Sequence, residues 1–304
     1  MNDEDLIKRI KEYDFYHDIK LKEGISTKSF KAEDELKYDI NDAFHWSQKK
    51  SLESLKKINF KNKRVLDIGC RDGLFSFEAE KRGASEVIGI DNNISKGATE
   101  LLIPYFKSKV KMFEKNLYEI TTNDFGKFDI ILFLGVLYHL RYPLYALKVI
   151  KNLLKEDSIL IIETAIYVDD NKRAFIYCPI GSESEFDKSC CTFFNVKALE
   201  NTLNSMGIAM AIKEVRVQKR DFRVLKNIIR FVLRTIFRKN MVFGIKTKHF
   251  KKHDQDIGKK VGPVSRAFFI CKLDNNLIDK EASDYWESYH KWHTPKTTSR
   301  YIKY

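Results

Sequence analysis

The sequence lacks any apolar run long enough to cross a membrane. No segment approaches the roughly 18 uninterrupted apolar residues of a membrane-spanning helix. The amino end, MNDEDLIKRIKEYDF, begins acidic and contains no apolar stretch of about seven residues, which a secretory signal would need. We therefore expect a cytoplasmic protein.

Cysteine is also scarce, and its spacing is unlike that of common metal sites. The five cysteines are odd in number and contain no C-x-x-C pair, as expected of reduced thiols in a reducing compartment. Cys178, Cys190 and Cys191 lie near one another in the sequence, but tetrahedral zinc sites usually draw on spaced pairs of ligands. No metal site is predicted.

Acidic residues are too few to balance the basic ones. The chain has 55 lysines and arginines against 42 aspartates and glutamates, a net charge of +13. Such a field favours an anionic partner, which includes RNA, acidic lipid and phosphorylated or acidic metabolites.

The residues that are present alternate as in a parallel α/β sheet. With 304 residues and 43% hydrophobic content, the chain can form one sizeable domain with appendages. From Arg64 onward, short apolar runs alternate with helical stretches, among them 74–82 and 143–154. We predict a Rossmann-like α/β fold of seven strands: RVLDIG, EVIGID, KVKMFEKN, FDIILFLG, SILIIETAI, IAMAIKEVRV and SRAFFICKL.

Three regions are predicted around this pattern. Residues 1–60 form an N-terminal helical cap segment, 61–275 the sheet domain, and 276–304 an aromatic and basic tail. Between the sixth and seventh strands lies an insertion, 219–262, that a simple hairpin would not need. Its residues 222–239 place basic side chains on one helical stripe and apolar ones on the opposite stripe. Three interpretations stay open: a packed helix with a solvated cationic face, a surface for RNA or an anionic substrate, and peripheral membrane contact.

A glycine turn follows the first strand, in the sequence VLDIGCRDG. In an open α/β sheet, ligands bind outside the carboxyl ends of the strands, where glycines let the backbone approach the ligand. We predict that Asp67 either accepts from an ammonium group of the ligand or braces the loop, while Gly69 and Gly73 permit the tight bend. Cys70 lies in the same turn, and Arg71 takes the place of a middle glycine.

An acidic residue ends the second strand, eighteen residues after Gly73. Asp91 is placed there to accept hydrogen bonds from both hydroxyls of a ribose. Asn116 and Leu117 follow the third strand, where a side chain and a backbone amide can read an adenine edge; for Asn116 an ordinary strand-end turn is the alternative. Together these motifs predict the binding of an adenosine nucleoside.

Asp67, Gly69, Gly73 and Asp91 resemble the motifs of class I S-adenosylmethionine-dependent methyltransferases. Within that class, three stretches resemble the family of the bacterial tRNA wobble-uridine carboxymethyltransferases and its uncharacterised relatives: FDIILFLGVLYHLRYPLYAL, SILIIETAI and FFNVKALENTLNSMGI. The resemblance spans roughly residues 60–218, so the insertion falls mostly outside it. It implies S-adenosylmethionine as the cofactor, with a turn that survives Arg71 because that side chain points outward.

Three residues are the catalytic candidates: Tyr138 and His139 beyond the fourth strand, and Glu163 at the end of the fifth. Tyr138 lies in the stretch GVLYH, which we call the GVLYH box. In the tRNA enzymes that the chain resembles, the tyrosine of this box contacts the carboxylate of a carboxylated cofactor, so this form of the cofactor is an alternative. His139 has the side chain of a general base toward a hydroxyl, but a structural histidine is the other interpretation. Further histidines, including His17, are candidates for contributing from a cap.

Three functions follow from these residues. The leading hypothesis is methylation of a hydroxyl or similar nucleophile on a small molecule or saccharide. The first alternative is methyl or carboxymethyl transfer to the wobble uridine of tRNA, which the positive charge and the GVLYH box favour. The second, based on Arg71, is a non-catalytic scaffold that binds a nucleoside or RNA.

Overall fold

The computed structural model describes residues 2–28, 42–169, 171–184, 188–216, 264–274 and 286. The predicted basic insertion at 219–262 lies outside these residues, and so does the tail at 276–304 except for Trp286. The description therefore covers the predicted sheet domain apart from residues 170, 185–187, 217–263 and 275, and most of the N-terminal segment.

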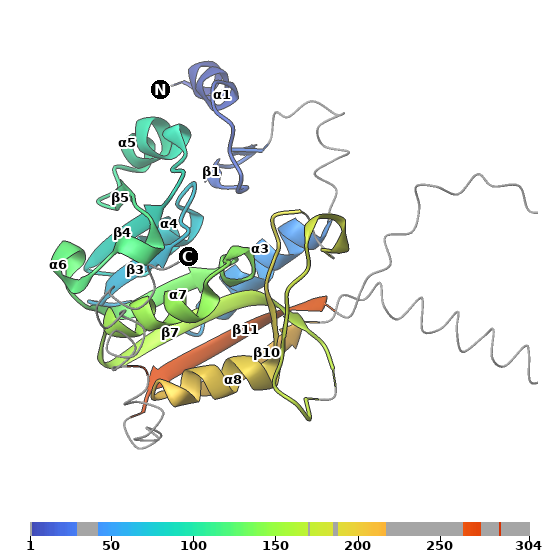
Figure 1. The fold of residues 1–304 in the computed structure, drawn as a ribbon. Coiled ribbons are helices and arrows are strands. Elements are labelled where there is room, and N and C mark those ends of the chain that lie inside the picture. Colours follow the sequence, from blue (N-terminus) through green and yellow to red (C-terminus); the bar gives the residue numbers. More distant parts are fainter. Residues whose placement is uncertain are drawn as a thin grey trace, which may run out of the picture.

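A single large sheet contains all seven predicted strands in the order β10-β11-β7-β6-β3-β4-β5 (Figure 1). Neighbours from β7 to β5 are parallel, whereas β11 is antiparallel to both β7 and β10. The carboxyl ends of the parallel strands therefore meet at one edge. The strand bounds are Arg64–Ile68 (β3), Glu86–Asp91 (β4), Lys111–Glu114 (β5), Phe128–Leu134 (β6), Leu154–Tyr167 (β7), Ile208–Arg216 (β10) and Val264–Leu273 (β11).

The sheet differs from the prediction beside β7. Two short strands that the sequence pattern did not indicate, β8 (Ile176–Tyr177) and β9 (Phe193–Asn195), extend it to nine strands. Strand β7 also continues beyond Glu163, because its backbone still pairs with β11 as far as Tyr167 opposite Val264. The prediction that Glu163 ends its strand was therefore wrong. Glu163 pairs instead with Leu134, the last residue of β6.

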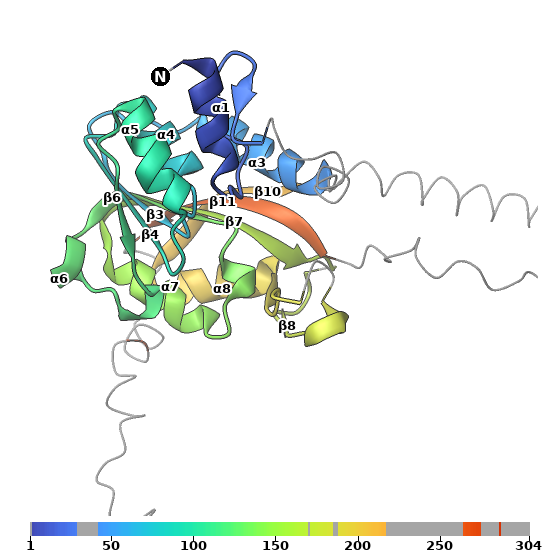
Figure 2. The same ribbon diagram turned by 90° about the horizontal axis from the view of Figure 1, so that it is seen from above.

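Helices cover both faces of the sheet (Figure 2). On one face lie α1 (Asp3–Lys11), α3 (Asp42–Leu55), α4 (Leu74–Lys81) and α5 (Ile103–Phe106), preceded by the π-helical turn η1 (Ala98–Leu102). On the other face lie α6 (Thr122–Phe125), α7 (Pro143–Asn152) and α8 (Val196–Ser205). The short helices are η2 (Leu117–Glu119), η3 (Leu137–His139) and η4 (Gly181–Glu183).

The N-terminal segment packs into the core of the first face. Leu6, Ile10 and Phe15 are 1–3% exposed and share a hydrophobic cluster with Val65 of β3 and Leu74 of α4. After α1 the chain forms a hairpin of β1 (Lys20–Lys22) and β2 (Ile25–Ser26). The burial of this segment fixes it beside the loop that follows β3.

Among the described helices, none has the length and apolar character to span a bilayer.

Candidate active site

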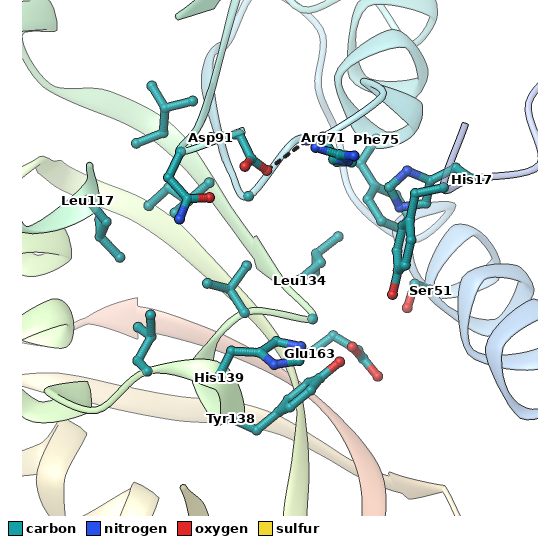
Figure 3. Close-up of a pocket in the computed structure, with 18 of the residues that line it drawn as sticks. His17, Ser51, Arg71, Phe75, Asp91, Leu117, Leu134, Tyr138, His139 and Glu163 are labelled. Atoms are coloured by element: carbon teal, nitrogen blue, oxygen red, sulfur yellow. Dashed lines mark hydrogen bonds between the residues drawn. The ribbon is translucent and has the colours of Figure 1, made fainter. Parts of the chain in front are cut away.

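A cavity of about 590 Å³ opens at the carboxyl ends of the parallel strands (Figure 3). The loops after β3, β4, β5 and β6 contribute to its wall, and so do β7, β11, α3 and the N-terminal segment. Of the predicted site residues, seven line it: Gly69, Asp91, Asn116, Leu117, Tyr138, His139 and Glu163. The topology therefore brings both halves of the predicted site into one space.

The glycine turn holds its shape through backbone contacts. Gly69 has a φ of 76°, and a Cβ added there would lie 2.3 Å from Cγ2 of Val136. Arg71 also adopts a left-handed backbone, with a φ of 46°, and its N–H donates to Oδ2 of Asp91 at 3.0 Å. The arginine thus has a backbone conformation that favours glycine. Its guanidinium donates to the carbonyl of Asn93, in the loop after β4, and Arg71 still lines the cavity.

Asp91 ends β4 at the wall of the cavity. Besides the contact with Arg71, its Oδ1 accepts the backbone N–H of Asn93 at 2.8 Å. Each carboxylate oxygen can accept more than one hydrogen bond. The side chain is therefore fixed by two backbone donors and retains acceptor capacity toward a ligand, as the predicted ribose contact needs.

The other three predicted cofactor residues, Asp67, Cys70 and Gly73, support the turn and do not appear in the described lining of the cavity. Asp67 is 1% exposed and accepts from Oγ of Ser76 at 2.6 Å. Burial raises the pKa of Asp67 to about 6, although the Ser76 hydrogen bond acts in the opposite direction. Two roles were predicted for Asp67: accepting from an ammonium group of the ligand, or bracing the loop. This geometry fits the second.

Cys70 and Gly73 occupy tightly packed positions of the turn. Cys70 is 2% exposed, and burial raises the pKa of its thiol above the ordinary range. Gly73 begins α4 with a φ of 83°, and an added Cβ would lie 2.2 Å from Cε of Met112. Both residues therefore shape the turn from below.

Asn116 and Leu117 lie at the start of η2. The Asn116 side chain accepts from the N–H of Tyr118 at 3.0 Å and donates to Glu119 at 3.2 Å. It therefore forms the strand-end turn that was the alternative interpretation, while its position in the cavity wall is also that of the predicted adenine contact. Leu117 is 9% exposed.

Tyr138 and His139 lie in η3, directly after β6. Tyr138 is 7% exposed, and the guanidinium carbon of Arg266 lies 4.8 Å from the centroid of its ring. Burial raises the pKa of the Tyr138 hydroxyl, and the nearby Arg266 charge acts against that rise. Nδ1 of His139 lies 3.0 Å from Oγ of Ser189, which orients the imidazole.

Glu163 forms a buried ion pair that the sequence did not reveal. Arg266 of β11 donates from Nε to Oε1 at 2.7 Å and from Nη2 to Oε2 at 2.5 Å, and Oγ of Ser47 donates to Oε1 at 3.1 Å. The Glu163 charge raises the pKa of Arg266 against the effect of burial, so the guanidinium stays charged. An arginine within the apolar strand SRAFFICKL was the available signal.

The N-terminal segment supplies a further wall. Tyr16 and His17 line the cavity, as do Ser47, Gln48 and Ser51 of α3. The sequence suggested His17 only as an outside candidate and indicated no role for Asp72, whose Oδ2 accepts the backbone N–H groups of Tyr16 and His17, each at 2.6 Å. Among the described residues, no group of histidine, cysteine and acidic side chains is arranged to hold a metal.

Comparison with known proteins shows the family to which the chain belongs. The family model described as "Methyltransferase domain" matches residues 43–211, more than half of the chain. The chain therefore belongs to this family. The crystal structure of the N-terminal domain of EvdMO1 with SAH bound has the same fold, with a TM-score of 0.55 and 12% identity over 90% of this chain and 98% of that one.

Curated relatives narrow the resemblance. The tRNA U34 carboxymethyltransferase of Helicobacter acinonychis (strain Sheeba) is 33% identical over 137 residues, which cover 44% of this chain and 50% of that protein. The enzyme of the same name from Campylobacter fetus subsp. fetus (strain 82-40) is 32% identical over 147 residues, 47% of this chain and 50% of that protein. The chain thus spans about half the length of the curated relatives it matches.

Proposed function

We propose that this protein transfers a methyl group from S-adenosylmethionine to a hydroxyl or similar nucleophile of a small molecule or saccharide. One observation carries the proposal: a single cavity is lined by four of the predicted cofactor residues and by all three catalytic candidates, namely Gly69, Asp91, Asn116, Leu117, Tyr138, His139 and Glu163. A donor and an acceptor bound in one space react without a separate encounter.

The residues around the cavity fit such a cofactor. Gly69, which has no room for a Cβ beside Val136, lines the cavity in the turn after β3. Asp91 offers carboxylate oxygens to the ribose hydroxyls, and Asn116 and Leu117 border the adenine. When bound, the cofactor supplies an activated methyl group, so the protein chiefly aligns the acceptor and excludes water.

His139 is the proposed general base. A histidine is suited to take a proton from an acceptor hydroxyl near neutral pH. In the tautomer whose Nδ1–H donates to Ser189, Nε2 at the other edge of the ring is the proton acceptor. Tyr138 forms the neighbouring wall, its ring 4.2 Å from the His139 ring. The two residues thus border the acceptor.

The second candidate function is carboxymethyl transfer to the wobble uridine of tRNA. The 33% identity to tRNA U34 carboxymethyltransferases favours it. A cofactor with an added carboxylate beside Tyr138 would need an available cation. Glu163 already accepts two hydrogen bonds from Arg266, which supports the plain methyl donor as the first choice.

Mass spectrometry of the small molecules retained by the purified protein tests the proposal. We expect S-adenosylmethionine or S-adenosylhomocysteine. Retention of the carboxylated cofactor would instead favour the tRNA alternative. Calorimetry with S-adenosylhomocysteine should show binding to the wild type, and Asp91→Ala should weaken it at least tenfold, a loss of about 1.4 kcal/mol or more. A folded wild type without affinity for either cofactor would support the scaffold interpretation.

A further inference from the structure

The cavity has a polar wall beside the glycine turn. His17, Ser47, Gln48 and Ser51 all line it, and they are between 2% and 9% exposed. Ser47 donates to Glu163 and Gln48 to the carbonyl of Asp18, so both side chains are held in place. The wall presents polar groups to a ligand, beside the apolar lining that Phe75 and Leu134 provide.

His17 is oriented by Asp72, a buried residue of the glycine turn itself. Nδ1 of His17 lies 3.3 Å from Oδ2 of Asp72, which is 0% exposed. The His17 ring also packs edge-on against the ring of Phe75, with centroids 5.8 Å apart. Burial acts to raise the pKa of Asp72, but the hydrogen bonds and charge of His17 outweigh it and lower the pKa.

Hydrogen bonds with two further residues fix the backbone around His17. Oγ1 of Thr27 donates to the His17 carbonyl at 2.6 Å and accepts from the N–H of Ile19 at 2.9 Å. Nε2 of Gln48, on α3, donates to the carbonyl of Asp18 at 2.8 Å. The imidazole therefore occupies a position set by three separate elements, as a preorganised binding group requires.

A cofactor in this cavity needs polar partners at its amino-acid end. Asp67 does not supply them, because it is buried beneath the turn and bonded to Ser76. With the ribose at Asp91 and the adenine at Asn116 and Leu117, the amino-acid end extends past Gly69 in the opposite direction. His17 and Ser51 lie on that side of the cavity, beside Phe75 (Figure 3).

We propose that His17, held by Asp72, binds the carboxylate at the amino-acid end of the cofactor, with Ser51 as a second donor. In the imidazolium form both ring nitrogens carry protons, so that Nδ1 faces Asp72 and the opposite nitrogen, Nε2, donates to the carboxylate of the cofactor. The 3.3 Å approach of Nδ1 to Oδ2 of Asp72 sets the orientation of the ring. The inference rests on the proposed function, because it assigns one more residue to the same cofactor.

Two ligands separate this role from a structural one. S-Adenosylhomocysteine carries the amino-acid end, whereas 5′-methylthioadenosine keeps the adenosine and the sulfur but lacks that end. We expect His17→Ala to weaken S-adenosylhomocysteine binding at least tenfold in calorimetry and to change 5′-methylthioadenosine binding less than about twofold. His17→Gln, which retains an N–H donor, should recover part of the lost affinity.

Lys20→Ala is the matched control, because it removes an exposed side chain of the same segment; it should leave both affinities unchanged. Equal losses for the two ligands in the His17 variants would overturn the inference, as would unchanged binding of S-adenosylhomocysteine. If the wild type binds neither ligand, the proposed function itself fails. These outcomes are therefore distinguishable.

Discussion

At the scale of single residues, Arg71 has a backbone conformation that costs a non-glycine residue free energy. Its φ of 46° lies in the left-handed region, and its N–H and guanidinium bind Asp91 and Asn93. Arg71→Gly relieves the backbone and keeps the N–H contact. We expect S-adenosylhomocysteine affinity to change less than about tenfold. Calorimetry measures this affinity. If Arg71→Gly binds S-adenosylhomocysteine and the wild type does not, the scaffold interpretation is favoured.

Asp67 makes stability depend on pH. Its pKa of about 6 in the folded protein exceeds the ordinary value of 3.8, so the folded state holds the proton more tightly than the unfolded chain. The stabilisation that protonated Asp67 adds to the free energy of unfolding is fully present below about pH 4 and is lost as the pH rises through about 6. That loss is on the order of 2–3 kcal/mol at neutral pH.

Asp67→Asn keeps the shape and removes the ionisation. We expect the variant to lack the decrease in unfolding free energy that the ligand-free wild type shows between pH 4.5 and pH 7.5. Urea denaturation at these two values measures it, with the exposed Asp124→Asn as the control. Parallel pH profiles for wild type and Asp67→Asn would show that the Asp67 carboxyl ionises normally.

At the scale of elements, the Glu163–Arg266 pair joins β7 to β11. Glu163 is 2% exposed and the Arg266 side chain 14%, so removing one partner leaves a buried charge. Arg266→Met should destabilise the fold by about 3 kcal/mol, and the charge-free double variant Glu163→Gln/Arg266→Met should recover much of that loss. Chemical denaturation of the single and double variants measures it. Additive losses would mean that the two residues do not interact.

The elements also show which parts of the site were predictable. Gly69 and Asp91 could be found because parallel strands end at one edge, so their sequence spacing fixes their position. Arg266 could not be matched to Glu163, since the two are joined only when β11 pairs with β7, across 103 residues. Asp72 was likewise missed, because its partners lie 55 and 56 residues earlier and are backbone groups without a side-chain signature.

At the scale of the whole molecule, the net charge of +13 and the basic insertion bear on the acceptor. Of the described ends that flank the insertion, Arg216 pairs with Arg266, which lines the cavity, and Val264 lies two residues before Arg266 in β11. We therefore predict that residues 219–262 contribute to acceptor binding. Replacing Arg230 and Arg234 by Glu should raise the acceptor KM strongly and leave S-adenosylhomocysteine affinity nearly unchanged.

Steady-state kinetics and calorimetry on that double variant check the prediction. For an RNA acceptor, wild-type affinity should also fall steeply with salt, and the variant should show a shallower dependence because it makes fewer phosphate contacts. If acceptor kinetics and membrane association are both unaffected by the charge reversal, the basic stripe is a solvated surface.

The way in which Asp72 holds the N-terminal segment has a consequence for how the protein can diverge. Asp72 accepts from the main-chain N–H groups of Tyr16 and His17, and any residue other than proline supplies such a group. These two contacts therefore remain with any non-proline residue at position 17, although the contact of the imidazole with Asp72 is lost. A library of non-proline replacements at this position keeps the main-chain anchor of the segment, which makes it the place to select for donors with a different tail.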